Sequence, residues 1–199
     1  MTLTADRENK LSRFSAQVTA VGGHFESVPD LPSAREYVTK LALARNAKRI
    51  VVCDDALSSR LFPTGAPEGL FEVAGSANSS REAFFKALET AKIGVSSVDL
   101  AVAETGTLII ATSNESNRLV TALPEVHIAI LPRSKLVDSL QEAEPHVSEI
   151  LKRTTGGVTI SLISASSRTS DIGDMVILGV HGPKELHVLL LDQELPGGA

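Results

Sequence analysis

The stretch from His24 to Cys53, HFESVPDLPSAREYVTKLALARNAKRIVVC, decides the fold class. It contains a short β-favouring run, then a helical pattern that starts after Asp30, then the apolar run Ile50–Cys53. An aspartate followed by Pro32 is typical of a helix start, because its side chain accepts from unpaired N–H groups and proline needs no donor there. Parallel strands need helical crossovers of this kind. The stretch therefore predicts a parallel α/β arrangement.

The same alternation of helix and strand continues along the chain. Helical patterns cover 5–21, 79–91, 113–122 and 134–153, the last interrupted by Pro145. β-favouring runs cover 98–103, 107–112, 126–131, 158–163 and 186–191, and a Gly-containing turn joins the first two as a hairpin or a bent strand. Residues 54–75 are predicted to be loop-rich, because Pro and Gly break any period there. We expect one domain over 1–199, with an N-terminal helical portion, about 1–46, packed on it.

Composition disfavours several classes of function. The chain has 199 residues, 43% of them hydrophobic, and a net charge of −5. It has no cluster of Lys and Arg for phosphate backbones, no Trp and a single Tyr, so nucleic acid is not an expected partner. The N-terminus lacks a signal-peptide pattern and no apolar run reaches transmembrane length, which predicts a cytoplasmic protein.

Cys53 is the single cysteine of the chain. An internal disulfide is therefore excluded, and an iron–sulfur cluster would lack its set of thiolate ligands within this chain. Because Cys53 ends an apolar run, it is predicted to be a buried structural thiol.

A polar loop, SASSRTSD at 164–171, follows the predicted strand 158–163. It combines five hydroxyl side chains with Arg168 and Asp171. Hydroxyl donors and one planar guanidinium suit a carboxylate or a phosphate, which predicts an anion site. The alternative is a solvated turn in which Arg168 pairs with Asp171 or Asp174.

Two further polar clusters lie at strand ends, where open α/β sheets usually bind ligands. Glu104 follows an apolar strand and precedes Gly106, so it is a candidate base, nucleophile or ligand anchor. The alternative is a turn residue bonded to local backbone or paired with Arg118. His181 stands before Gly182-Pro183 and is either a proton donor and acceptor or a structural hydrogen-bonding residue.

Metal and nucleotide sites are not predicted. His127, His181 and His187 with Asp171 offer nitrogen and oxygen ligands, but no pair of histidines shows the close spacing of a known metal motif. Glycine-rich phosphate-binding patterns are absent from the sequence. We therefore expect no metal and no other cofactor in this chain.

Four motifs resemble those of the LUD-domain family, in particular its lactate utilisation protein C branch. They are Ala103–Thr107, Leu123–Ala129, Ser166–Ile172 and Leu178–Val188. They follow one another from about residue 90 to 191, whereas the first half agrees only in its layout of helices and strands. Two departures are Ala165-Ser166-Ser167, where the family commonly has Gly-Pro-Ser, and Gly173, where it often has Glu. The missing acid weakens the case for a mechanism with two carboxylates.

The resemblance implies a fold like that of the phosphosugar-isomerase and CoA-transferase group, a Rossmann-like open sheet, mostly parallel, with helices on both faces. It also implies a role in oxidising L-lactate beside partner subunits that carry iron–sulfur clusters, with no redox centre in this chain. The family's motifs suggest a candidate pocket for a small anionic ligand. Its residues are Glu104 as the catalytic candidate, and Thr105, Gly106, Ser166, Ser167, Arg168, Thr169, Asp171 and His181 as ligand-binding candidates.

Two other functions remain open at this point. Glu104-Thr105-Gly106 is similar to the segment around the nucleophilic glutamate of some CoA transferases, so an acyl-transferring, phosphosugar or folate-type enzyme of the same fold is one alternative. The other is a scaffold or ligand-sensing protein without catalysis.

Overall fold

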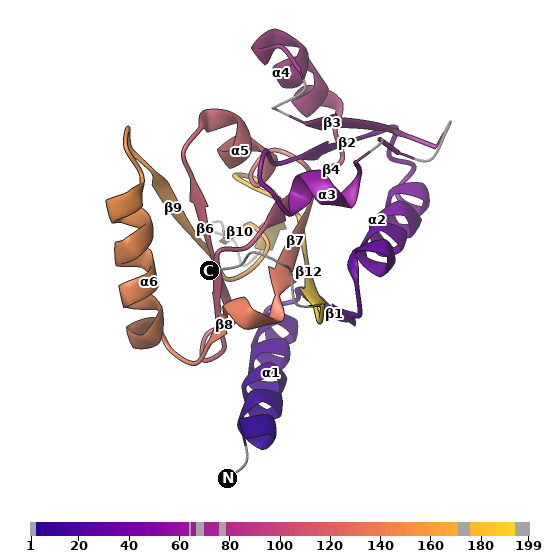
Figure 1. Cartoon of the computed structure of the whole chain (residues 1–199). Coiled ribbons are helices and arrows are strands. Elements are labelled where there is room, and N and C mark those ends of the chain that lie inside the picture. Colours follow the sequence, from indigo (N-terminus) through magenta and orange to yellow (C-terminus); the bar gives the residue numbers. More distant parts are fainter. Residues whose placement is uncertain (1–2, 64, 67–69, 76–78, 171–175, 194–199) are drawn as a thin grey trace.

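The computed structural model describes residues 3–63, 65–66, 70–75, 79–170 and 176–193 (Figure 1). Its main sheet has six strands in the order β1-β12-β7-β4-β2-β3, and every neighbouring pair is parallel. The strands are β1 (His24–Val28), β12 (Glu185–Leu191), β7 (Val126–Pro132), β4 (Ile93–Ser97), β2 (Arg49–Val52) and β3 (Glu72–Gly75). The prediction of a mostly parallel α/β sheet is confirmed.

One face of the main sheet is covered by α2 (Leu31–Ala44) and the short α3 (Ser58–Leu61). As predicted, Asp30 caps α2: its carboxylate accepts a hydrogen bond from the N–H of Ser33 at 2.9 Å. Apolar side chains from five of the strands, β1, β2, β4, β7 and β12, are buried beneath these two helices. Burial of this extent on both faces is what makes parallel strands read as continuous apolar runs.

The other face is covered by α1 (Leu3–Ala20), α4 (Arg81–Thr90) and α5 (Glu115–Val120). Phe14 and Val18 of α1 are fully buried against the central strands. The end of α5 lies directly on β4, because a Cβ added at Gly94 would be 2.1 Å from the carbonyl oxygen of Val120. Helices therefore cover both faces of the main sheet, as the sequence predicted.

A small sheet packs beside α1 in the order β8-β5-β6-β9. Its strands are β8 (Leu136–Val137), β5 (Leu100–Val102), β6 (Thr107–Thr112) and β9 (Thr159–Ile163). β5 and β6 form the expected antiparallel hairpin. Helix α6 (Leu140–Arg153) covers the outer face (Figure 1). Ala143 of this helix packs there against side chains of β5 and β6. The inner face joins the core between α1 and the main sheet.

The remaining elements are short. A 3₁₀ turn, η2 (Arg133–Lys135), follows β7, and β10 (Arg168–Ser170) pairs antiparallel with β11 (Val176–Leu178). Among the helices that the structure describes, none combines the length and apolar character needed to cross a membrane.

The structure adds two strands of the main sheet that the sequence pattern did not indicate. β3 lies in the segment predicted to be loop-rich, and β4 lies between the predicted helix 79–91 and the predicted strand 98–103. β3 has four residues and β4 contains a glycine and two serines, so neither has an extended apolar pattern. Both strands are instead stabilised by their pairing with β2.

Two other boundaries also differ. The predicted helix 134–153 begins only at Leu140, because Leu136 and Val137 pair with β5 as β8, and Ser139 caps the helix. Pro145 lies inside this helix without ending it. The first 46 residues are not only helical, since β1 within them forms an edge strand of the main sheet.

Candidate functional site

A cavity of about 290 Å³ lies between β9 of the small sheet and the amino ends of β7 and β12 in the main sheet. Strands, α5 and two loops contribute its walls. The lining residues are Arg118, Thr121, Ala122, His127, Ser161, Leu162, Ile163, Ser164, Ala165, Ser166, Ser167, His181, Gly182, Pro183 and Leu186. The cavity therefore includes much of the hydroxyl-rich loop and of the histidine loop that the sequence singled out.

Backbone hydrogen bonds hold these two loops together. The N–H of Ser167 donates to the carbonyl of Pro183 at 2.8 Å, and the N–H of Gly179 donates to the carbonyl of Ser167 at 3.0 Å. The N–H of His181 also donates to the Ser167 hydroxyl at 3.4 Å. The loops are thus joined where they meet the cavity, which positions Ser166, Ser167 and His181 around one space.

His127 is buried in the second position of β7 and lines the cavity. Its Nε2 lies 2.9 Å from the Ser96 hydroxyl, whereas Nδ1 has no hydrogen-bond partner among the described residues. Burial lowers the pKa of His127 to about 4, so the ring is neutral near pH 7. Leaving a buried polar atom unpaired costs about 1–3 kcal/mol, so Nδ1 is well suited to receive a partner from the cavity.

The charged groups of the lining favour an anion. Arg118 is exposed, and its guanidinium has no partner among the residues that the structure describes. Among the described residues, the lining contains five hydroxyl side chains and no Asp or Glu. A small carboxylate would therefore meet a guanidinium and hydroxyl donors, and no negative charge from the described lining would compete with it.

Arg168, the guanidinium predicted to hold the anion, lies elsewhere. Its Nη2 donates to the carbonyl of Val21, just after the end of α1, and Arg168 is not among the lining residues. Thr169 pairs with Ile177 in the β10–β11 hairpin, and Asp171 lies outside the described residues. Of these three residues, the structure thus places the Arg168 side chain away from the cavity.

The turn between β5 and β6 carries Glu104, Thr105 and Gly106. Glu104 is exposed, its N–H donates to the carbonyl of Asp138 at 3.0 Å, and it forms no salt bridge within the described part of the chain. It is not a lining residue of the cavity. Gly106 has φ +67° and lies against α1, because an added Cβ would be 2.8 Å from the Cβ of Gln17.

A chain of hydroxyl groups connects this turn to the cavity. The Thr105 hydroxyl lies 2.7 Å from that of Thr107, which in turn lies 2.8 Å from that of Ser164. Thr107 is buried, and Ser164 lines the cavity. The turn therefore supports the hydroxyl-rich loop, although Glu104 itself points to no described partner there.

No local sequence pattern indicated Arg118, Thr121 or Ser161 as ligand-binding residues. The sequence indicated His127 only as one of several possible metal ligands. The structure separates His127 from His187, because His127 faces the cavity and the α1 side of the main sheet, while His187 faces α2. His181 lines the cavity with His127, and Asp171 lies outside the described residues. The described side chains that do converge in the manner of a metal site are His24, Glu185 and His187.

The structure is therefore that of an α/β protein with an open parallel sheet, beside which lies a cavity suited to binding an anion. The family model of the LUD domain matches residues 11–191, so the chain belongs to the LUD domain family, as the motifs predicted. The match covers both sheets and the cavity.

Curated relatives carry names from lactate metabolism. "Lactate utilization protein C" of Bacillus subtilis (strain 168) is 33% identical over 114 residues, which cover 54% of this chain and 46% of that protein. "Lactate utilization protein B" of Geobacillus kaustophilus (strain HTA426) is 24% identical over 92% of this chain and 48% of that protein. The chain thus spans about half the length of the curated relatives it matches.

A solved structure also resembles this chain. It is the crystal structure of a DUF162 family protein from Deinococcus radiodurans, with a TM-score of 0.61 and 19% sequence identity over 94% of this chain and 98% of that one. This likeness supports the fold.

Proposed function

We propose that this chain serves lactate utilisation by binding a small organic-acid anion, of the size of lactate or pyruvate, in the cavity beside β7 and β9. The observation that carries the proposal is the lining, whose described residues offer a guanidinium, two imidazoles and five hydroxyl groups but no carboxylate. The names of the relatives support the choice of acid.

The burial of the lining residues suggests how the acid is oriented. Arg118 and His181 are exposed and form the mouth, while His127 is buried and forms part of the floor. The carboxylate binds Arg118 and the hydroxyls of the serine loop, because charge-assisted hydrogen bonds are the stronger ones. The hydroxyl or keto oxygen of the acid binds Nδ1 of His127, and the methyl group contacts Leu186.

The proposal also includes partner proteins, which would accept the electrons released when the acid is oxidised. Cys53 is the only cysteine of the chain, it is buried, and its thiol donates to the carbonyl of Asn117 at 3.5 Å. The thiolate ligands of an iron–sulfur cluster would have to come from outside these 199 residues. We therefore propose iron–sulfur proteins of the lactate system as partners. Co-purification of the chain from lactate-grown cells is the test, and a chain that never associates with iron–sulfur proteins would contradict this part.

A thermal-shift titration tests ligand binding itself. Ligand that binds only the folded state raises stability by about 2.7 kcal/mol at 100 times Kd, which is a rise in Tm of about 5–10 °C for a chain of this size. We expect the rise with lactate or pyruvate and not with phosphosugars or CoA esters. Stabilisation by a CoA ester alone would favour the transferase alternative.

Two arginine variants make the test specific to the cavity. Arg118→Gln removes the guanidinium of the lining, so it is expected to weaken binding about tenfold or more. Arg168→Gln removes the guanidinium at the end of α1 and is expected to leave the ligand affinity unchanged. The opposite result would assign the anion site to Arg168 and overturn the site proposed for the cavity.

A further inference from the structure

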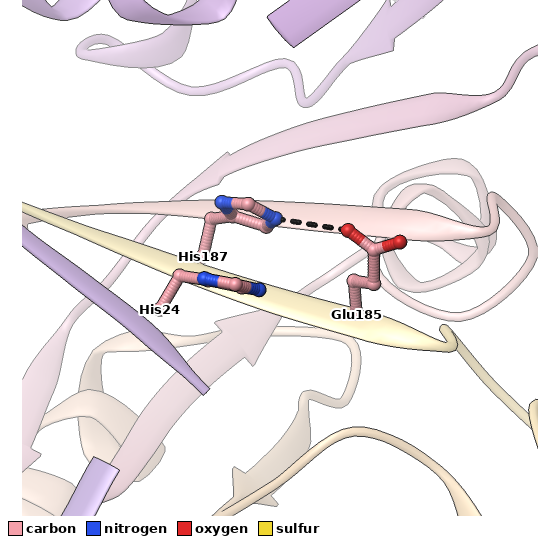
Figure 2. Close-up of side chains that lie close together, drawn as sticks. All are labelled: His24, Glu185 and His187. Carbon is pink, nitrogen blue, oxygen red and sulfur yellow. Dashed lines mark hydrogen bonds and ion pairs between the residues drawn. The ribbon is translucent and has the colours of Figure 1, made fainter. Parts of the chain in front are cut away.

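A second group of side chains lies on the α2 side of the main sheet, away from the cavity. His24 begins β1, Glu185 begins β12, and His187 follows two residues later (Figure 2). Each offers a ligand atom, and these atoms all lie within 4.8 Å of one another. Figure 2 shows the two rings one above the other, with the Glu185 carboxylate directed at the ring of His187.

The parallel register of the sheet creates this group. His24 pairs with His187 across β1 and β12, so their side chains project from the same face. Glu185 lies on that face as well, because side chains two residues apart on a strand point the same way. The two histidines come from opposite ends of the chain, which is why their spacing in the sequence resembled no metal motif.

The distances fit a metal ion between His187 and Glu185. Nε2 of His187 lies 3.2 Å from Oε2 of Glu185. Two ligands that each bind Zn²⁺ at about 2.0–2.1 Å with a tetrahedral angle lie about 3.3 Å apart. Nδ1 of His187 lies 2.8 Å from the Tyr37 hydroxyl, which fixes the ring and its tautomer, as the outer partners of metal-binding histidines do.

His24 completes the group by a small movement. Its ring is stacked on that of His187, with centroids 4.2 Å apart and planes inclined by 18°. Because the nitrogen lone pair lies in the plane of the ring, His24 must turn out of the stack to bind the same ion. The His24 side chain is exposed, whereas His187 is buried. Packing therefore restricts the rotation of His24 less than that of His187.

We propose that His24, Glu185 and His187 bind a divalent transition metal such as Zn²⁺. Two imidazoles and one carboxylate favour Zn²⁺, Fe²⁺ or Co²⁺ over Mg²⁺ and Ca²⁺, which prefer oxygen ligands. Three protein ligands leave a fourth position for solvent or for a group supplied by another molecule. The site is separate from the cavity and does not depend on the proposed function.

Arg45 competes with the metal for the carboxylate. Its Nη2 lies 2.7 Å from Oε2 of Glu185, and 44% of its side chain is exposed. A guanidinium at this distance disfavours a cation through charge repulsion, although the carboxylate has a second oxygen and Arg45 has room to move away. Removing this charge should therefore tighten metal binding.

Calorimetric titration of the full-length, tag-free protein with ZnCl₂ after EDTA treatment tests the proposal. We expect one equivalent to bind, and we expect His24→Ala and Glu185→Gln each to weaken binding about tenfold or more. His146→Ala is the matched control, because it removes an exposed histidine of α6 and should leave the affinity unchanged. Co²⁺ absorption then reports the number and type of ligands.

The Arg45→Gln variant separates this site from adventitious binding elsewhere. We expect its affinity for Zn²⁺ to rise several-fold, which no site remote from Glu185 would show. Absence of Zn²⁺ binding by the wild-type protein overturns the proposal, as does wild-type affinity in either His24→Ala or Glu185→Gln. Unchanged or weaker affinity in Arg45→Gln also overturns it. Circular dichroism of each variant checks that the fold is retained.

Discussion

The Ser96 hydroxyl and Nε2 of His127 lie 2.9 Å apart in the interior, on the adjacent strands β4 and β7. This pair holds a neutral imidazole in the wall of the cavity and leaves its other nitrogen, Nδ1, without a partner among the described residues. Because this imidazole is buried and neutral, the stability of the protein should depend measurably on pH.

Stability should fall as the pH drops below about 6.5 towards 4. His127 has a pKa of about 4 in the folded protein and an ordinary value of 6.5, so between these values the unfolded chain binds the proton and the folded protein does not. Linkage then predicts a loss of about 2 kcal/mol at pH 5 relative to pH 7 from this group. Urea denaturation at the two pH values measures it.

Variants assign this pH effect to His127. His127→Gln should remove most of the difference between pH 7 and pH 5, whatever it does to stability at pH 7. His146→Ala, which removes an exposed histidine of α6, should retain the difference. If the His127→Gln variant keeps the full wild-type difference, another group is responsible.

Gly94→Ala should destabilise the protein by about 3 kcal/mol. The new Cβ would lie 2.1 Å from the carbonyl oxygen of Val120, and this backbone atom cannot move without shifting the end of α5. Gly75→Ala is the control, since among the described residues its Cβ would meet Val52 Cγ2 alone, at an ordinary 3.5 Å. Equal unfolding midpoints in guanidinium chloride for the two variants would argue against the close packing of α5 on β4.

Thr107→Val should weaken binding of the acid even though Thr107 does not line the cavity. The substitution breaks the hydroxyl chain to Ser164 and leaves one fewer support for the serine loop, at a cost of about 1–2 kcal/mol in stability. Thr105→Val removes only the exposed end of the chain and should have a smaller effect. Denaturation and the thermal-shift titration together measure both consequences.

Glu104→Gln should leave the ligand-induced rise in Tm unchanged, because Glu104 is exposed and lies outside the lining. The transferase alternative makes the opposite prediction, namely acyl-CoA turnover that this substitution abolishes. An assay of acyl transfer with the wild-type protein and the variant distinguishes the two.

Much of the fold could be predicted because its central strands are buried on both faces. β7 and β12 consist almost wholly of apolar residues, and the Asp30 cap marks the start of α2. β4 escaped notice because Gly94 and two serines interrupt its apolar pattern, and the glycine is required by the approach of α5. Such a strand is specified by its neighbours rather than by its own residues.

The candidate site was predicted in part. Ser166, Ser167 and His181 lie in polar loops next to buried strands, which is a local signal, and the structure brings them to one cavity. The choice between Arg118 and Arg168 is not local, because it depends on whether α5 or the end of α1 lies nearer the cavity. His127 could not be assigned either, since one histidine in an apolar strand indicates only burial.

The position of β12 has a consequence for how the protein is made. β12 comes late in the sequence, yet it lies between β1 and β7 and pairs with both. While the ribosome is still translating the middle of the chain, β1 and β7 have no strand between them and the core beneath α1 is incomplete. Contacts between residues so distant in sequence make folding slow. The nascent chain therefore depends on synthesis of β12, and on protection of its exposed strand edges until then, to reach its native sheet.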